Sequence, residues 1–555
     1  MPNHFAMLLA AENPVLIYIT RIFSPDPFQG IYKPNSFDLF VLVPYFTILI
    51  ILAILGVHRY YMMYLYYRNR PQRLSPLHDV PVPLGKFSDL PRVTIQLPIF
   101  NERYVAERMI EEACKIEYPS ERLDIQVLDD STDETAALAR DCVERYAALG
   151  HPITYLHRTN REGYKAGALA EGLLQAKGEF VAIFDADFLP PADFLTRTID
   201  HFTDPKVALV QTRWTYLNRH FSWLTEVQAI LLDGHFVYEH IARTKTGRYF
   251  NFNGTAGIWR RVAIDEAGGW EHDTLTEDAD LSYRAQLLGW KFVYRPDIEC
   301  LSELPVEMNA FKTQQARWAK GLIQVGMKIL PRVLRSDAPR HVKTEAFYHM
   351  TANLSYPLMI VLALLSFPAM IIRFYQGWFQ MLYIDLPLMA AATLSVSAFY
   401  MGSQRELFPD DWKRSFRYLP LILATGVGLT LTNSWAVFEA LMGKQSEFVR
   451  TPKYSLNAAG SSGGRHFFGN VYRKRAHWVA MIEVLLGCYF TYTVYFAIMS
   501  ANYATAFFLS LFVLGYLGTG LISLFQGKWD RWSELAGGAV RFALRAFVRV
   551  TVPRA

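Results

Sequence analysis

Long apolar runs lie on both sides of a segment of mixed polar and apolar character. Five runs have about the length at which a helix crosses the hydrocarbon layer of a bilayer. They cover residues 39–57, 350–372, 386–401, 478–499 and 504–525. Each run is therefore predicted to be a transmembrane helix, and residues 74–345 are predicted to be soluble.

A sixth apolar run, 419–442, is interpreted from the charges around it. Basic residues crowd both flanks: Arg405, Lys413, Arg414 and Arg417 before it, and Lys444, Arg450 and Lys453 after it. Positive flanks stay cytosolic, and one spanning helix cannot have both ends there. Asn433 and Glu439 within the run also disfavour lipid on all sides. We predict an interfacial or re-entrant helix; the alternative, six spans, would place 444–475 outside.

Arginines after the first run, Arg59, Arg68, Arg70 and Arg73, predict a cytosolic soluble domain and an external N-terminus. The expected organisation follows. It comprises an N-terminal segment with the first span (1–75), a cytosolic domain (76–345), two spans (346–403), an interfacial helix and loop (404–476), two further spans (477–527) and a basic amphipathic cytosolic tail (528–555). The protein is thus expected to be a multi-pass integral membrane protein.

Within the soluble domain, short β-rich runs alternate with amphipathic helical ones. The expected strands are 93–97, 125–128, 153–156, 180–184 and 207–210, and the clearest helix is 162–176. Such alternation predicts an α/β fold with a mostly parallel sheet covered by helices. Ligands of these sheets bind beyond the carboxyl ends of the strands. Two acidic motifs directly follow expected strands, which is where a nucleotide crevice should lie.

The composition fits a membrane protein better than a nucleic-acid-binding one. Of 555 residues, 52% are hydrophobic, 15% are aromatic and 19% are charged. The net charge is +5, but Lys and Arg cluster beside the apolar runs rather than in a stripe on the soluble part. Membrane lipids are therefore expected partners, and nucleic acid is not.

The first acidic motif, Asp129-Asp130-Ser131, follows the strand 125–128. A carboxylate here can accept hydrogen bonds from the imide or amino group of a base. The same residue types also form Asx turns and helix caps. Both acids remain candidates for nucleotide binding, with Asp130 preferred.

The second motif, Asp185-Ala186-Asp187, ends the strand 180–184. Acids two residues apart in extended chain point to the same side. Together they can hold one Mg²⁺ or Mn²⁺, which takes diphosphate oxygens as further ligands. As a lone motif, Asp-x-Asp is more often a turn; its place after a hydrophobic strand favours a metal site that also contacts the donor.

Two motifs further along the chain complete the set. Glu277 and Asp278 follow Thr276, which is typical of a helix cap but also of a general base. Gln314-Gln315-Ala316-Arg317-Trp318 follows about 40 residues later. Arg317 can make paired contacts with a diphosphate, and Trp318 offers a flat apolar face to a sugar ring. A Trp beside a membrane is otherwise an interfacial anchor.

The order of these motifs resembles the processive membrane glycosyltransferases of family 2, the cellulose synthase and hyaluronan synthase group, over residues 90–455. The resemblance implies a GT-A-type, Rossmann-like domain inserted between transmembrane helices, and an inverting, metal-dependent transfer. It makes Asp278 the base, with Glu277 beside it. It assigns Gln314 and Arg317 to the nucleotide sugar and Trp318 to the acceptor.

Three further segments share this resemblance. Lys165, in Gly-Tyr-Lys-Ala-Gly, would lie against phosphate, although a lysine on a helix surface is unremarkable alone. Gly254 and Thr255, in Phe-Asn-Gly-Thr, would form the acceptor floor, unless the glycine only makes a turn. The segment 448–453 resembles a gating loop, with Phe448, Thr451 and Lys453 matching and Arg450 replacing the usual Val.

The motifs look most like the cellulose-synthase-like A and C families and their bacterial relatives. This implies a β-glucan, mannan or glucomannan built from UDP-glucose or GDP-mannose on a growing polysaccharide acceptor. The run after Asp278 resembles bacterial enzymes, which favours UDP-glucose and the bacterial inner membrane over the Golgi. A non-processive transfer of one hexose to a lipid acceptor is the alternative. Few residues follow the last span, so a cyclic-di-GMP-binding domain is not expected.

Overall fold

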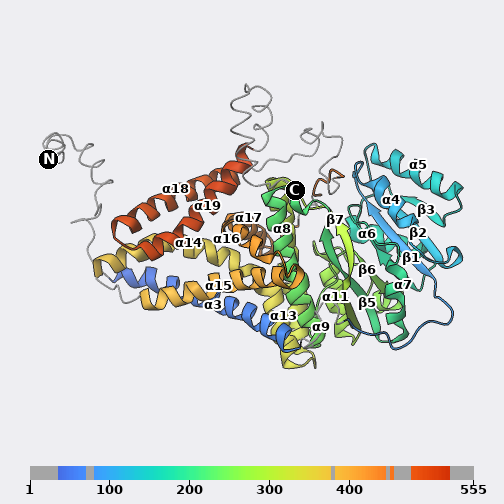
Figure 1. The fold of residues 1–555 in the computed structure, drawn as a ribbon, viewed down its shortest axis with the longest axis horizontal. Helices are drawn as coiled ribbons and strands as arrows, with labels where there is room; N and C mark the ends of the chain where they lie inside the picture. The colour runs from blue at the N-terminus through green and yellow to red at the C-terminus, as the bar shows by residue number, and fades with distance from the viewer. Residues whose placement is uncertain (1–35, 70–79, 377–381, 446–449, 456–476, 526–555) are drawn as a thin grey trace, which may run out of the picture.

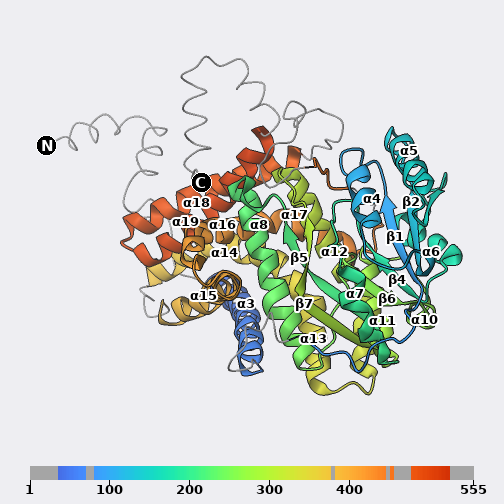
Figure 2. The same ribbon diagram turned by 45° about the vertical axis from the view of Figure 1, so that its right-hand side comes forward.

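The computed structural model describes residues 36–69, 80–376, 382–445, 450–455 and 477–525 (Figure 1). An α/β domain lies at one end of the molecule and a bundle of long helices at the other. Figure 2 shows helix α8 running between the sheet and the bundle. The predicted fold class, an α/β domain inserted between apolar helices, is confirmed.

Seven strands form one mixed sheet, in the order β3-β2-β1-β4-β6-β5-β7. The strands are β1 (Val93–Ile99), β2 (Leu123–Asp129), β3 (Ile153–His157), β4 (Phe180–Ile183), β5 (Val207–Tyr216), β6 (Gly257–Arg260) and β7 (Lys291–Ser302). Only β6 runs antiparallel to its neighbours, β4 and β5; the other pairs are parallel. Because β6 is reversed, its first residues lie at the edge where the parallel strands end.

Helices cover both faces of the sheet. The α-helices of this part are α4 (Ala106–Cys114), α5 (Thr135–Ala148), α6 (Tyr164–Gln175), α7 (Phe194–Thr198), α8 (Trp223–Gly234), α9 (Ile241–Lys245), α10 (Arg261–Glu266), α11 (Glu277–Leu287), α12 (Met308–Arg335) and α13 (Arg340–Thr351). Alternate strand residues point to opposite faces. Ala182 packs in the cluster with α4, α5 and α7, whereas Val181 and Ile183 pack with α6, α10 and α11.

Short 3₁₀ segments and one π-helical segment complete this part of the chain. The 3₁₀ segments are η1 (Ser120–Arg122), η2 (Ile199–Thr203), η3 (Arg219–Phe221), η5 (Ala352–Leu354) and η7 (Trp412–Tyr418). The π-helical segment η4 (His235–His240) joins α8 to α9. Its Tyr238 packs against Tyr66 and Phe399 of the apolar helices. The π turn therefore lies where the α/β domain meets the bundle.

All five predicted strands are present, and the predicted helix 162–176 is α6. Two strands were not predicted. β6 has only four residues, which is too short for an alternating pattern to show. β7 contains Pro296 and Asp297, residue types that are depleted in strands. β7 lies at the edge of the sheet, where a proline is tolerated.

The apolar runs form long helices. They are α3 (Phe37–Arg68), α14 (Ser355–Gln376), α15 (Leu382–Leu407), α16 (Leu419–Gly428), α17 (Thr430–Leu441), α18 (His477–Met499) and α19 (Tyr503–Phe525). In the described residues, five helical stretches are long and apolar enough to cross a membrane: Asp38–Arg68, Arg340–Tyr375, Trp412–Leu441, Trp478–Met499 and Tyr503–Phe525. Among the described residues, this criterion of length and composition includes the sixth run, which the flanking charges assign to the interface, and leaves out α15, which contains the predicted span 386–401. The topology of both runs stays a prediction.

Candidate active site

One cleft opens at the carboxyl edge of the sheet, where ligands of such folds bind. The chain reaches it directly after β1, β2, β4 and β7 and just before β6. Its charged lining residues are the acids Glu102, Asp130, Asp185, Asp187, Glu277, Asp278 and Glu303 and the bases Arg161, Lys165, Arg317, Arg450 and Lys453. A site with this mixture suits a metal–diphosphate group and a proton transfer.

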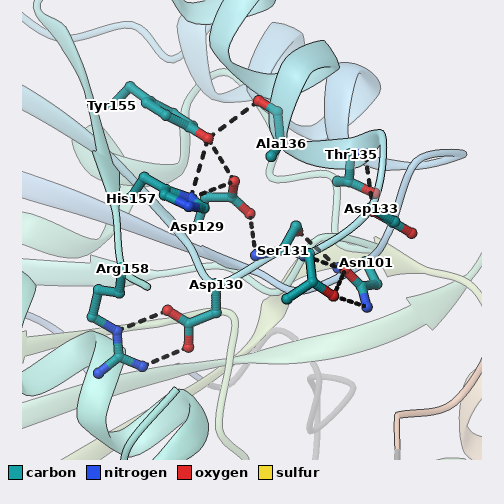
Figure 3. Close-up of polar contacts among 11 residues, drawn as sticks. Asn101, Asp129, Asp130, Ser131, Asp133, Thr135, Ala136, Tyr155, His157 and Arg158 are labelled. Carbon is teal, nitrogen blue, oxygen red and sulfur yellow. Dashed lines mark hydrogen bonds and ion pairs between the residues drawn. The ribbon is translucent and has the colours of Figure 1, made fainter. Parts of the chain in front are cut away.

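The two acids after β2 have different surroundings (Figure 3). The Asp129 carboxylate is fully buried and accepts hydrogen bonds from the Ser131 backbone N–H, at 2.9 Å, and the Tyr155 hydroxyl, at 2.6 Å. It therefore builds the Asx turn that shapes the loop. Asp130 lines the cleft, and Arg158 holds its carboxylate through Nε, at 2.7 Å, and Nη2. The geometry favours Asp130 as the residue that meets a base.

The predicted metal acids both line the cleft and are each paired with a lysine. Lys165 donates to Asp185 Oδ1 and to the Gly254 carbonyl, the latter at 2.7 Å. Lys453 donates to Asp187 Oδ2 at 2.7 Å. Burial lowers the pKa of Lys165, but the charges of Asp185 and of nearby acids outweigh it and leave this pKa raised. Both lysines therefore bring positive charge to the acid pair.

Glu277 and Asp278 begin α11, and both side chains face the cleft. Burial raises the pKa of Asp278 above the ordinary aspartate range, and the negative charge of Glu277 raises it further. The pKa of Glu277 is raised by burial as well. A carboxylate with a raised pKa is a better proton acceptor at neutral pH, so this pair is suited to general-base chemistry.

The loop before β6 fits closely against Asp278. Gly254 has φ +80°, and a Cβ placed on it would lie 3.0 Å from Asp278 Oδ2. Thr255 is buried, and its hydroxyl accepts from the Asp185 backbone N–H at 2.8 Å. Both residues were predicted to line the acceptor floor. The structure places Gly254 in the cleft and gives Thr255 the task of fixing the Asp185 backbone.

Helix α12 brings Gln314, Arg317 and Trp318 to the cleft together. They lie at positions i, i+3 and i+4, which share one helix face. The guanidinium of Arg317 lies in the field of Glu277, Asp185 and other cleft acids. The spacing of this motif is therefore explained by the need to direct three side chains to one place.

Segment 450–455, which follows the interfacial run, lies over the cleft. Arg450 donates to the Phe100 carbonyl at 3.2 Å, and the Tyr454 backbone N–H donates to Glu303 Oε1 at 2.7 Å. Thr451 and Lys453 line the cleft, as predicted for a gating loop. The hydroxyl of Thr451 is buried without a partner in the described residues. Phe448, the remaining predicted residue of this loop, lies outside the described residues.

Several cleft residues were not anticipated. Glu102 follows β1, and burial raises its pKa to about 7, with Asp187 and Asp185 adding to the rise. Arg161 lies over the Phe100 ring at 3.4 Å. Glu303 follows β7 and binds the segment over the cleft. Because ligands bind at strand ends, the predicted strand 93–97 could have pointed to Glu102. Glu303 could not be found in this way, because β7, which it follows, was not predicted from the sequence.

Comparisons with known proteins agree with this geometry. Residues 91–321 match the family described as Glycosyltransferase like family 2. Glucomannan 4-beta-mannosyltransferase 2 of Arabidopsis thaliana is 46% identical over 281 residues, which are 50% of this chain and 52% of that protein. Glucomannan 4-beta-mannosyltransferase 7 of the same plant is 38% identical over 345 residues, 59% of this chain and 61% of that protein. The chain thus spans between half and two thirds of the length of these relatives.

Among solved structures, the mannosyltransferase PcManGT from Pyrobaculum calidifontis, in complex with GDP-Man and Mn²⁺, is similar with a TM-score of 0.47 and 23% identity, over 66% of this chain and 99% of that one. The family match covers the whole sheet, the four acidic positions and the first half of α12. The α/β domain thus matches the family 2 glycosyltransferases over residues 91–321, and it lies between long apolar helices.

Proposed function

We propose that this protein is an inverting, metal-dependent, processive hexosyltransferase that builds a β-linked mannan or glucomannan from GDP-mannose and passes it across the membrane. One observation carries the proposal. A single cleft contains Asp130 for the nucleobase, the acid pair Asp185 and Asp187, the half-buried Asp278 and Trp318 of α12. Each is needed for a different part of one glycosyl transfer.

The acceptor hydroxyl would be activated by Asp278. As its oxygen forms the bond to the anomeric carbon, the bond from that carbon to the nucleoside diphosphate breaks, and the proton passes to the Asp278 carboxylate. Attack from the face opposite the leaving group inverts the configuration, so an α-linked donor yields a β-linked product. Trp318 would hold the acceptor sugar by its ring face.

The acid pair suits a divalent cation. Asp185 and Asp187 both line the cleft, and each binds its lysine through one of its two oxygens. Carboxylate oxygens are the ligands that Mg²⁺ and Mn²⁺ prefer, and a bound cation would stabilise charge on the departing diphosphate. Lys165, Arg317 and Lys453 surround the same acids and would bind diphosphate oxygens.

Mannose is favoured as the transferred sugar by the names of the two relatives, which both refer to glucomannan and to mannosyl transfer. This shifts the balance from UDP-glucose, which the sequence motifs slightly favoured. Guanine presents an N1–H and an exocyclic amino group side by side. The Asp130 carboxylate, whose orientation Arg158 fixes through two hydrogen bonds, could accept hydrogen bonds from the N1–H and from the amino group.

Radiolabel incorporation by the purified, detergent-solubilised protein tests the proposal. GDP-mannose and UDP-glucose would be offered separately with Mn²⁺ or Mg²⁺, and the products digested with linkage-specific glycanases. We expect high-molecular-weight β-linked mannan from GDP-mannose, none after chelation with EDTA, and none from Asp278→Asn. Asp265→Asn, an exposed change on α10, serves as the matched control.

Two results would overturn parts of the proposal. Polymer from UDP-glucose alone would replace the donor and leave the mechanism. Label that enters only a lipid fraction, one hexose per acceptor, would establish the non-processive alternative instead.

A further inference from the structure

A buried ion pair joins α12 to the apolar helices behind it. Lys312 Nζ donates to both oxygens of Glu483 on α18, at 2.6 and 2.7 Å, and lies 3.3 Å from Ser523 Oγ on α19. Lys312 is 5% exposed and Glu483 is 0% exposed. Asn309, one turn earlier, donates to the Ser523 carbonyl at 3.2 Å. The start of α12 is thus bonded to two helices at once.

The Lys312–Glu483 pair lies on the same helix as Trp318 and can therefore affect the position of this proposed acceptor residue. Lys312 lies six residues, fewer than two turns, before Trp318 on the same helix. Lys312 and Lys320 reach the apolar helices, the latter through Glu439 of α17 at 3.0 Å, while Gln314 and Trp318 face the cleft. A shift of α12 along α18 therefore moves the α12 residues of the cleft, Trp318 and Arg317 among them, relative to Asp278, and leaves Asp130 after β2 in place.

We propose that Lys312 and Glu483 are positioning residues for the acceptor: their buried, directional pair fixes the position of α12, and hence of Trp318, against the helices through which the product would leave. The inference rests on the proposed function, because it concerns the acceptor of that reaction. Glu483 accepts Lys312 through both oxygens, so the pair defines a position along the helix that an apolar contact of similar size would not.

Four variants separate positioning from simple stability. Lys312→Met and Glu483→Gln each leave one partner buried alone. Lys312→Met/Glu483→Leu replaces the pair by an apolar contact, and Lys312→Glu/Glu483→Lys restores it with the charges exchanged. Arg332→Met, an exposed change near the far end of the same helix, is the control. The readouts are thermal stability, the dissociation constant for guanosine and the length of the polymer.

We expect the single variants to lose thermal stability and to shorten the polymer about tenfold or more, as small misplacements near a reacting centre do. The dissociation constant for guanosine, which lacks the phosphates that Arg317 of α12 would bind, should stay within about twofold, because Asp130 and its partners are untouched. The apolar double variant should regain stability but keep making short chains. The charge-exchanged variant should regain both.

Normal chain length in the apolar double variant would overturn the inference and leave the pair a structural contact. A changed guanosine affinity in every variant would overturn it too, since the effect would then extend to the nucleobase site around Asp130. If the wild-type protein transfers only single sugars, the proposed function fails separately. In that case the KM for the acceptor is measured in place of chain length. The single variants and the apolar double variant should raise this KM, and the charge-exchanged variant should restore it.

Discussion

Opposing effects act on the pKa of Asp278. Burial and the charge of Glu277 raise its pKa, while the Ala279 backbone N–H donates to Oδ1 at 2.8 Å and lowers it. The base works only when it is deprotonated. Activity should therefore rise with pH through this raised pKa, so that the acid limb of kcat/KM lies above the roughly 4 expected for an ordinary aspartate.

Changing the neighbour tests the origin of this limb. Glu277→Gln removes a negative charge beside Asp278, so the pKa of Asp278 should fall and the acid limb should move to lower pH by about one unit. The pH dependence of kcat/KM is the measurement, with Glu266→Gln on α10 as the control. An acid limb at the same pH in both variants would mean that another group sets it.

Gly254 allows a second test at the scale of one residue, because Gly247 has a similar backbone conformation and serves as its control. Gly254→Ala brings left-handed strain at φ +80° and places a Cβ 3.0 Å from the base oxygen. Gly247→Ala brings similar strain at φ +64°, but no atom lies within 4 Å of its Cβ. Both changes should cost about 1–2 kcal/mol of unfolding free energy.

Only Gly254→Ala should also lower kcat, by about tenfold or more, because Asp278 must move. Thermal unfolding and initial rates on the two variants measure this. Equal rates in both variants would show that the close approach to Asp278 has no part in catalysis.

At the scale of elements, the sequence predicted what periodicity and strand ends can show. The strands β1 to β5, the helix α6 and the acids after β2 and β4 follow from alternation and from the position of Asp130 and Asp185. The sequence could not predict that Asp129 is buried in the loop while Asp130 lines the cleft. This difference depends on Tyr155 of β3 and on Arg158 of the loop after β3, which bind the two carboxylates. Contacts between distant segments leave no local pattern.

Segment 450–455 shows the same limit. The motif predicted a loop over the cleft, but the sequence gives no sign that Lys453 bonds to Asp187 or that Arg450 reaches the Phe100 carbonyl. In this arrangement the ammonium group of Lys453 occupies one oxygen of the proposed metal pair. The segment and a cation would therefore compete for Asp187 until a diphosphate offers Lys453 another partner.

This competition can be measured without turnover. Lys453→Met should tighten Mn²⁺ binding in the absence of nucleotide by about tenfold, or ~1.4 kcal/mol, because the cation no longer displaces an ammonium group. Titration calorimetry with Mn²⁺ gives the dissociation constant, and Lys444→Met, an exposed change, is the control. Unchanged affinity would show that Lys453 does not oppose the metal.

For the whole molecule, contacts with the α/β domain indicate which helix ends share its side of the membrane. Gln404, near the end of α15, accepts from Arg219 at 2.7 Å, and Tyr418 packs with Val227 of α8. At the other end of the sixth run, Glu439 bonds to Lys320 of α12. Both ends of this run thus meet the α/β domain or α12.

The helices of this run are also short. α16 has 10 residues and α17 has 12, and either helix alone would reach about 15 or 18 Å, below a hydrocarbon thickness of about 30 Å; only the whole stretch Trp412–Leu441, of 30 residues, is long enough to cross. In Figure 1 both lie close to α8 rather than at the far end of the bundle. Geometry therefore supports the interfacial interpretation, although composition alone would count the run as a span.

The topology follows as a prediction with α3, α14, α15, α18 and α19 as the five crossings. The ion pair between Arg373 and Asp385 joins the end of α14 to the start of α15, and in Figure 1 these helix ends lie away from the α/β domain. In sealed right-side-out vesicles, a protease tag near residue 460 should be protected and a tag inserted at 377–381 should be cleaved. Permeabilising the vesicles should expose both tags. Cleavage at 460 in sealed vesicles would make the sixth run a true span. That result would conflict with the hydrogen bond from Lys453 to Asp187, which requires that segment 450–455 and the cleft lie on the same side of the membrane.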